Sequence, residues 1–226
     1  MSAHVVALGT PWSGVPGLVL PAFWQTAEMV GISMAIVVLI GGPLGFLIFN
    51  TSPRGLAPHP GTNAVVSWFA NLGRSLPFLV LMASIIPFTE LVVGTTIGIQ
   101  AAIIPMSLAG IPFFARLVEN AIREVPSEFL DVGRASGASR WQIIRSIQLT
   151  EGLPGIAAGL TLNIIAMIEY SAIAGAIGAG GLGYLAVNDG YEQFDANIMI
   201  TCIALLIVVT QIIQFTGDRV VRSLLH

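Results

Sequence analysis

The sequence predicts an all-α integral membrane protein that crosses the bilayer several times. Of its 226 residues, 55% are hydrophobic and only 9% are charged, and the mean hydropathy is +0.86. Soluble domains carry about 25% charged residues, so this chain has too few charges to cover a globule in water. Its apolar residues also gather in runs of about 20, the length with which an α-helix crosses about 30 Å of hydrocarbon.

Five apolar runs are expected to form the membrane spans. They are about Phe23–Phe49, Ala64–Phe88, Thr96–Val118, Leu153–Ala174 and Ala196–Phe215. Residues 1–22 have no basic residue before their apolar positions, so they lack the positive start of a secretory signal. We expect residues 1–22 to form an extracytoplasmic leader and residues 23–226 to form the transmembrane domain.

Several prolines lie inside or near these runs, at Pro43, Pro77, Pro105 and Pro112. Each internal proline removes one helix hydrogen bond and pushes on the preceding turn. In lipid, such breaks persist where neighbouring helices or a water-lined cavity cover the freed backbone. The prolines therefore favour a transporter or channel over a simple anchor, although Pro and Gly are more frequent in membrane helices generally.

The arginines set the orientation. With five spans, one side of the membrane carries eight of the nine basic residues: Arg54, Arg116, Arg123, Arg134, Arg140, Arg145, Arg219 and Arg222. The other side carries Glu90, Asp189, Glu192 and Asp195, and the ninth arginine, Arg74, lies within the second span. Because positive residues stay in the cytoplasm, the N-terminus is predicted outside and the C-terminus inside.

Composition also excludes several functions. All nine basic residues are arginine, so the chain cannot supply the lysine of a phosphate-binding loop, and any ATP chemistry must come from a partner. A net charge of −3 without a basic run gives little support to nucleic-acid binding. The three histidines are too scattered for a metal site. The single cysteine, Cys202, lies in an apolar stretch and is expected to serve packing.

One polar block interrupts the apolar sequence. Ten of the 21 charged residues fall between Arg116 and Glu151. Two short helices, about Ser127–Ser136 and Ser139–Leu149, fit around Gly137, because glycine most readily adopts a left-handed cap. This pattern is typical either of an interfacial helix on the membrane or of a helix–turn–helix that enters a groove on another protein.

The block resembles the EAA loop of ABC importer permeases, over residues 126–150. Asp131 stands at the acidic position, Val132 and Gly133 at the small positions, and Gly137 six residues after the acid. The sequence departs from the pattern in having Asp for the commoner Glu, and Leu149-Thr150 where Leu-Pro is usual. Other segments resemble the methionine importer permeases in particular, among them "RSLPFLVLMASIIPFT", "PFFARLVENAIREVP", "YSAIAGAIGAGGLG" and "IQFTGDRVVRSL".

This resemblance, which covers about residues 23–224, implies a permease and not an enzyme. Two copies would form a pathway in a bacterial inner membrane for methionine, in its L and possibly its D form. Two ATPase subunits, which bind ATP and Mg²⁺, would dock on the loops, and an extracytoplasmic binding protein would deliver methionine. No cofactor is expected in this chain. The residues expected to couple to the ATPase are Asp131, Arg134, Ala135, Gly137, Ala138, Trp141 and Ile144. Asp131 and Arg134 either form a local ion pair or contact the partner.

Candidate pathway residues lie in the second and fourth spans: Arg74, Asn163, Glu169, Tyr170 and Ser171. A carboxylate in a membrane span points to function, so Glu169 is a candidate to line the pathway near the substrate ammonium. It could instead pair with Arg74 or lie at the outer interface. Arg74 could meet the substrate carboxylate, cap the cytoplasmic end of the second span, or snorkel. The neutral polar residues could instead tie helices together.

The glycine-rich segment "GAIGAGGLG" at the outer end of the fourth span is expected to form an outer gate, with Gly178, Gly180 and Gly181 as its candidate residues. The acids that follow, Asp189, Glu192 and Asp195, either meet the binding protein or are solvated. The alternative function is an ion-coupled secondary transporter with Glu169 as its proton site. The five spans show no evident internal repeat, which weighs against that alternative.

Overall fold

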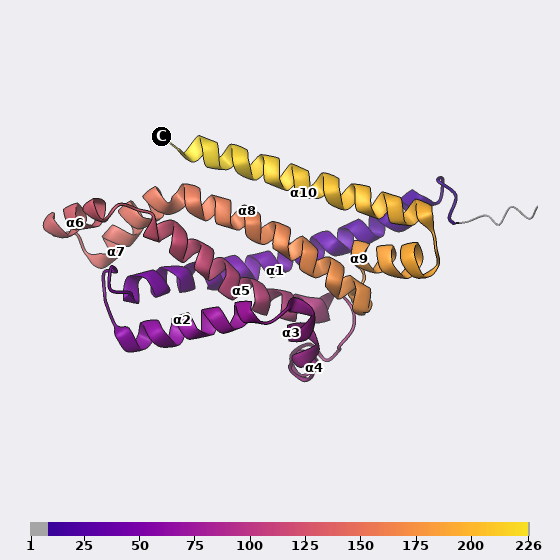
Figure 1. Cartoon of the computed structure of the whole chain (residues 1–226), viewed down its shortest axis with the longest axis horizontal. Coiled ribbons are helices and arrows are strands. Elements are labelled where there is room, and N and C mark those ends of the chain that lie inside the picture. The colour runs from indigo at the N-terminus through magenta and orange to yellow at the C-terminus, as the bar shows by residue number, and fades with distance from the viewer. Residues whose placement is uncertain (1–8, 226) are drawn as a thin grey trace, which may run out of the picture. The chain divides into compact units, whose positions relative to one another are not determined.

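The computed structural model describes residues 9–225, apart from the side chain of Arg74, and within that range every regular element is a helix (Figure 1). The elements are α1 (Val15–Thr51), α2 (Pro60–Ser75), α3 (Phe78–Ser84), α4 (Ile86–Val93), α5 (Ile99–Arg123), α6 (Ser127–Ala135), α7 (Arg140–Ile143), η1 (Ile144–Gln148), α8 (Leu149–Ala174), η2 (Gly175–Ala179), α9 (Gly181–Tyr184), η3 (Leu185–Glu192) and α10 (Ala196–Leu224). The η elements are π-helical turns, in which each hydrogen bond spans five residues instead of four.

Four described stretches are long and apolar enough to cross a membrane: Val15–Thr51, Ile99–Arg123, Arg140–Ala179 and Ala196–Leu224. They correspond to the first, third, fourth and fifth runs expected from the sequence. The first helix begins at Val15 and not at Phe23, so part of the expected leader is helical. Residues 1–8 of that leader lie outside the described residues.

The second expected span is not one helix. Within the expected span Ala64–Phe88 the chain breaks at Leu76 and Pro77, between α2 and α3, and Pro77 is one of the prolines noted in the sequence. Leu76 has an extended backbone, with φ −94° and ψ 129°, since the ring of a following proline disfavours the helical conformation. The described residues therefore contain four spans, or five if α2 and α3 form one broken span. The prolines at 43, 105 and 112 lie inside the continuous helices α1 and α5.

The chain divides into two compact units, and each contains part of α1, α5, α8 and α10. The described part of unit 1 comprises residues 9–33, 78–106 and 167–212. In its core, the first turns of α1 pack against α9, the start of η3 and the start of α10. The buried residues of this core are Val15, Val19, Ala22, Leu182, Leu185, Ile198 and Cys202. Cys202 is fully buried among these side chains, so the expectation that it serves packing is confirmed.

Unit 2 comprises residues 34–77, 107–166 and 213–225, and its helices pack closely at glycines. A Cβ at Gly45 of α1 would lie 2.5 Å from the carbonyl oxygen of Ala115 on α5. A Cβ at Gly155 of α8 would lie 2.8 Å from Cβ of Ala121, also on α5. The same tight approach recurs four residues away, at Gly41 and Gly159. Two glycine pairs at this spacing let α5 approach both neighbours, which is how membrane helices gain packing without a hydrophobic driving force.

Candidate functional site

The central polar block lies in unit 2 and folds as α6, a glycine turn and α7 (Figure 1). Gly137 has φ 73°, and the N–H of Ala138 donates to the carbonyl oxygen of Gly133 at 3.1 Å, which closes the end of α6. Ser139 and Gln142 form a capping box at the start of α7. The expected turn at Gly137 is therefore present.

The second helix of the block is longer than expected. It was predicted to end near Leu149, but α7 continues through η1 into α8. The chain has no glycine or proline between Ser139 and Gly152, so nothing in that stretch stops the helix. A movement of α7 would therefore act directly on the long helix α8.

The inner face of the block depends on one small residue. A Cβ at Gly133 would lie 2.8 Å from Cδ1 of Ile147 and 3.1 Å from Cγ1 of Ile143. Ile143 is buried, and so is Leu130 on α6. Gly133 therefore lets α6 lie directly on the helix that follows it.

The outer face of the block exposes large apolar side chains. Trp141 is 69% exposed, Val132 63% and Phe129 46%. Ile144, which the sequence placed among the coupling residues, is half-buried. Of the other candidates, Ala135 and Gly137 are exposed and Ala138 is partly buried. Of these three exposed residues, only Trp141 was among the coupling residues expected from the sequence.

Asp131 and Arg134 form the local ion pair that the sequence allowed, with 2.9 Å between Oδ1 and Nη1. Arg134 also donates from Nη2 to the carbonyl oxygen of Gly55, in the loop after α1, at 2.9 Å. Both side chains line a cavity of about 490 Å³, together with Arg54 and Glu128. Arg134 thus fixes α6 to the loop after α1, while Asp131, whose side chain is 67% exposed, still faces outward.

A buried amide pair joins the end of α1 to η1. Asn50 Nδ2 donates to Gln148 Oε1, and Gln148 Nε2 donates to Asn50 Oδ1, both at 2.9 Å. Gln148 is fully buried and Asn50 is 8% exposed. Buried polar groups are stable only when they are hydrogen-bonded, so this reciprocal pair fixes the register of η1 against α1. No local sequence signal identified either residue, because 98 positions separate them.

A second buried polar cluster lies on α5. Glu119 is 3% exposed and forms ion pairs with Arg116 and Arg123, one turn away on either side. Arg116 also donates to the carbonyl oxygen of Ser67 and to Oδ1 of Asn71, both on α2. The cluster holds α2 against the half of α5 that leads into the polar block.

The expected gate glycines lie in unit 1, and each has a positive φ: 106° at Gly178, 87° at Gly180 and 79° at Gly181. The turn is held from α1, where Gln25 Oε1 accepts the N–H of Gly181 at 2.8 Å and Thr26 Oγ1 accepts that of Leu182 at 2.9 Å. The carbonyl of Gly178 accepts the N–H of Gly98 at 3.2 Å. Two side chains of α1 and one backbone N–H of the loop before α5 thus hold this glycine turn in place.

The same turn is closely packed on itself. A Cβ at Gly183 would lie 2.3 Å from the carbonyl oxygen of Ala172, and one at Gly175 would lie 2.6 Å from the backbone N of Tyr184. Both obstacles are backbone atoms, which cannot rotate aside. These two glycines are needed for space and not for an unusual φ.

Three of the candidate pathway residues have structural partners. Tyr170 stacks on Phe78, with ring centroids 4.4 Å apart. Ser171 is buried and donates to the carbonyl oxygen of Ile168. Asn163 is fully buried and donates from Nδ2 to the carbonyl oxygen of Gly110 at 3.3 Å, while its Oδ1 has no partner within the described part of the chain. The contacts of Tyr170 and Asn163 tie α8 to α3 and to α5, whereas the hydrogen bond of Ser171 lies within α8.

Glu169 is exposed on α8 and lies outside the lining of the polar cavity described below. The side chain of Arg74 lies outside the described residues, so the proposed pair between Arg74 and Glu169 stays a prediction.

A polar cavity of about 690 Å³ lies in unit 1, where α1, the loop before α5 and the glycine turn meet. Its lining contains Gln25 and Glu28 from α1, Gln100 from α5, Gly178 and Gly180 from the turn, and Tyr184 from α9. Glu28 lies within the first membrane span, where a carboxylate is costly. The rule that singled out Glu169 would also have found Glu28, which the sequence analysis overlooked.

Comparison with known proteins places the chain in a family. The family described as binding-protein-dependent transport system inner membrane component matches residues 41–225. The chain belongs to this family. A probable D-methionine transport system permease protein MetI of Vibrio cholerae is 44% identical to this permease over 209 residues, which cover 92% of the chain and 93% of the relative. The D-methionine transport system permease protein MetI of Escherichia coli is 41% identical over 206 residues, covering 91% and 95%.

Similarity to solved structures supports the same family. An inward-facing structure of the MetNI methionine ABC transporter matches with a TM-score of 0.91 at 40% identity, covering 93% of this chain and 97% of that chain. An amino acid ABC transporter crystallised with histidines matches with a TM-score of 0.77 at 18% identity, which shows a shared fold. The resemblance to methionine importer permeases that the sequence indicated is thus confirmed.

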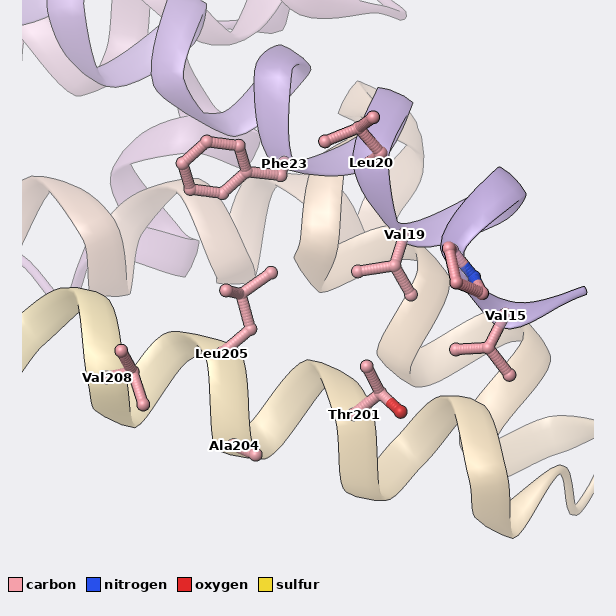
Figure 2. A pocket seen from close by; sticks show the side chains of 9 residues that line it. Val15, Val19, Leu20, Phe23, Thr201, Ala204, Leu205 and Val208 are labelled. Carbon is pink, nitrogen blue, oxygen red and sulfur yellow. The ribbon is translucent and has the colours of Figure 1, made fainter. Parts of the chain in front are cut away.

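The permease also has an apolar groove in unit 1, between α1 and α10 (Figure 2). Its volume is about 600 Å³, and Val15, Val19, Leu20, Phe23, Thr201, Ala204, Leu205 and Val208 lie along it. Apart from the hydroxyl of Thr201, the side chains along the groove have no polar atoms. The groove therefore has almost no group that could bind the charged ammonium and carboxylate of an amino acid.

Among the acids that follow the glycine turn, Asp195 has an internal role. It is buried and accepts the N–H of Thr10, and it caps the start of α10 by accepting the N–H groups of Asn197 and Ile198. Burial raises its pKa, but these hydrogen bonds outweigh burial and leave the pKa below its ordinary value. Asp195 is therefore not a free surface acid, whereas Glu192 is exposed.

Proposed function

We propose that this chain is the permease subunit of an ABC importer for methionine. Two copies form the pathway across a bacterial inner membrane, two ATPase subunits supply ATP and Mg²⁺ chemistry, and an extracytoplasmic binding protein delivers the substrate. The observation that carries the proposal is the match to the MetNI methionine transporter, at 40% identity over 93% of the chain. Relatives of 37–44% identity that carry the name D-methionine permease support the same substrate.

The orientation follows from the arginines. The polar block and the C-terminus lie in the cytoplasm, while the glycine turn and the residues after it lie outside, in line with the positive-inside rule. The exposed Trp141, Val132 and Phe129 form the surface on which an ATPase subunit docks. Because α7 runs into α8 without a break, a movement of the ATPase reaches the membrane through a rigid helix.

Uptake by purified components tests this function. The permease is reconstituted in liposomes with the ATPase and binding protein encoded beside it, and entry of radiolabelled methionine is measured. We expect uptake that requires ATP and is insensitive to collapse of the proton gradient. Uptake driven by a proton gradient without the ATPase would contradict the proposal and favour the secondary transporter.

The comparisons give no support to that alternative. Glu169, its proposed proton site, lines neither the polar cavity nor the apolar groove.

A further inference from the structure

Among the described residues that line the polar cavity of unit 1, one is charged. Glu28 is exposed, and it makes no hydrogen bond or ion pair with any described residue. It belongs to the 37-residue helix α1, which contains no other charged residue. A carboxylate at such a position is costly and marks a functional site by default. None of the described residues that line the cavity is a cation, so Glu28 has no charged partner among them.

The neutral groups around Glu28 are suited to bind a negatively charged group of a ligand. Gln25 presents Oε1 to the N–H of Gly181, which leaves its amide N–H groups free to donate. Gln100 and Tyr184 line the same cavity with an amide and a hydroxyl. These groups donate hydrogen bonds to a carboxylate. Ile97 and Ile99 add apolar surface to the lining.

The cavity also adjoins the glycine turn that the sequence suggested as an outer gate. Gly178 and Gly180 line it, and Gln25 both lines it and holds the turn through Gly181. Gln25 accepts the N–H of Gly181 with Oε1 and can donate its amide N–H groups to a ligand, so one side chain contacts both the turn and the ligand. Binding in the cavity and the conformation of the turn are linked through this one side chain.

We propose that this cavity is an entry site for a zwitterionic amino acid, in which Glu28 binds the α-ammonium and the amides of Gln25 and Gln100 bind the α-carboxylate. The proposal rests on the proposed import function and assigns to Glu28 the role that the sequence suggested for Glu169. The site recognises the ammonium and carboxylate groups of the amino acid, and the apolar surface of Ile97 and Ile99 accommodates an uncharged side chain.

The test is Glu28→Gln in the reconstituted transporter, with Glu90→Gln as the matched control. Glu90 is an exposed carboxylate of the same unit that does not line the cavity. We expect Glu28→Gln to lower methionine imported per ATP hydrolysed about tenfold, the loss that removing one hydrogen bond to a charged group produces. The rate of ATP hydrolysis and the elution volume of the assembled transporter should match the wild type, as should all three properties of Glu90→Gln. Glu28→Asp should recover part of the loss.

Equal import by Glu28→Gln and the wild type would overturn the proposal, and so would an equal loss in Glu90→Gln. Failure of the wild type to import methionine would instead refute the import function itself, so the two failures are distinguishable. Should Glu28→Gln not assemble, Gln100→Ala replaces it, because Gln100 is an exposed residue in the first turn of α5. Unchanged import by that variant would then overturn the proposal.

Discussion

Two glycine turns, one in each unit, use the same residue for different reasons. Gly137 and Gly181 have nearly equal backbone angles, with φ 73° and 79°. A Cβ at Gly137 would meet no atom within 4 Å, whereas one at Gly181 would lie 2.7 Å from Oγ1 of Thr26 and 2.9 Å from Cε of Met29. Gly137 is needed only for conformation and leaves its surroundings open. The turn at Gly181 is also closely packed, so it can move only together with its neighbours.

The largest expected effect is at the packed turn, in Gly183→Ala. The new Cβ would lie 2.3 Å from the carbonyl oxygen of Ala172, and a backbone atom cannot move aside without distorting α8. We expect a loss of about 3 kcal/mol or more in the free energy of unfolding, the upper range for overpacking. Thermal unfolding of the detergent-solubilised permease measures this loss, and a stability equal to that of Gly137→Ala would remove the distinction between the turns.

The second largest effect is expected at the buried amide pair of Asn50 and Gln148, which lies in the same unit as the turn at Gly137. Gln148→Leu leaves Oδ1 of Asn50 buried without its donor, and we expect a cost of about 1–3 kcal/mol. Replacing both residues by leucine should recover much of that cost, because neither polar group is then left unpaired. A double-mutant cycle on unfolding measures the coupling. A double variant that loses as much as both single changes added together would show that the pair is not a unit.

A smaller effect is expected at Gly137→Ala. Nothing blocks the methyl group, so only the left-handed backbone is penalised, by about 1 kcal/mol. The transporter should still assemble and bind its ATPase subunit. Gly137→Asn serves as the control, since asparagine tolerates this conformation better and should lose less. Loss of folding in Gly137→Ala would show that the turn is packed after all.

The smallest effect is at Asp195, next to the packed turn. Asp195→Ala removes the cap of α10 and should cost about 1 kcal/mol at neutral pH. Because the native pKa of Asp195 lies below its ordinary value of 3.8, this stabilisation is complete above that value and is lost as the pH falls through the lower native pKa. The stabilities of wild type and variant should therefore converge in acid. A difference that grows below pH 3.8 would contradict the assignment.

The sequence predicted best the features that depend on local composition. Four long helices follow from apolar runs, since the lipid requires every backbone group to be satisfied within a helix. The turn at Gly137 follows from one glycine between two polar helical segments. The chain breaks directly before Pro77, whereas the prolines at 43, 105 and 112 lie inside continuous helices, so the prolines alone did not show which span would break.

The sequence could not supply the contacts that depend on distant partners. Asn50 and Gln148 meet across 98 positions, and Gly181 meets Gln25 across 156. Glu28 was visible as a carboxylate in an apolar run, but only the fold brings it to the glycine turn. Such residues have no local pattern, since their role arises from the packing of separate helices.

Photo-crosslinking in the assembled transporter tests most directly the claim that the polar block is the joint with the ATPase. Benzoylphenylalanine replaces Trp141 in one variant and Tyr191 in another; these aromatic residues are 69% and 67% exposed, so both are open to a partner. We predict that the variant at position 141 crosslinks to the ATPase subunit and that the variant at position 191 does not. A crosslink to the ATPase from position 191, or its absence from position 141, would contradict both the coupling role and the orientation proposed for this permease.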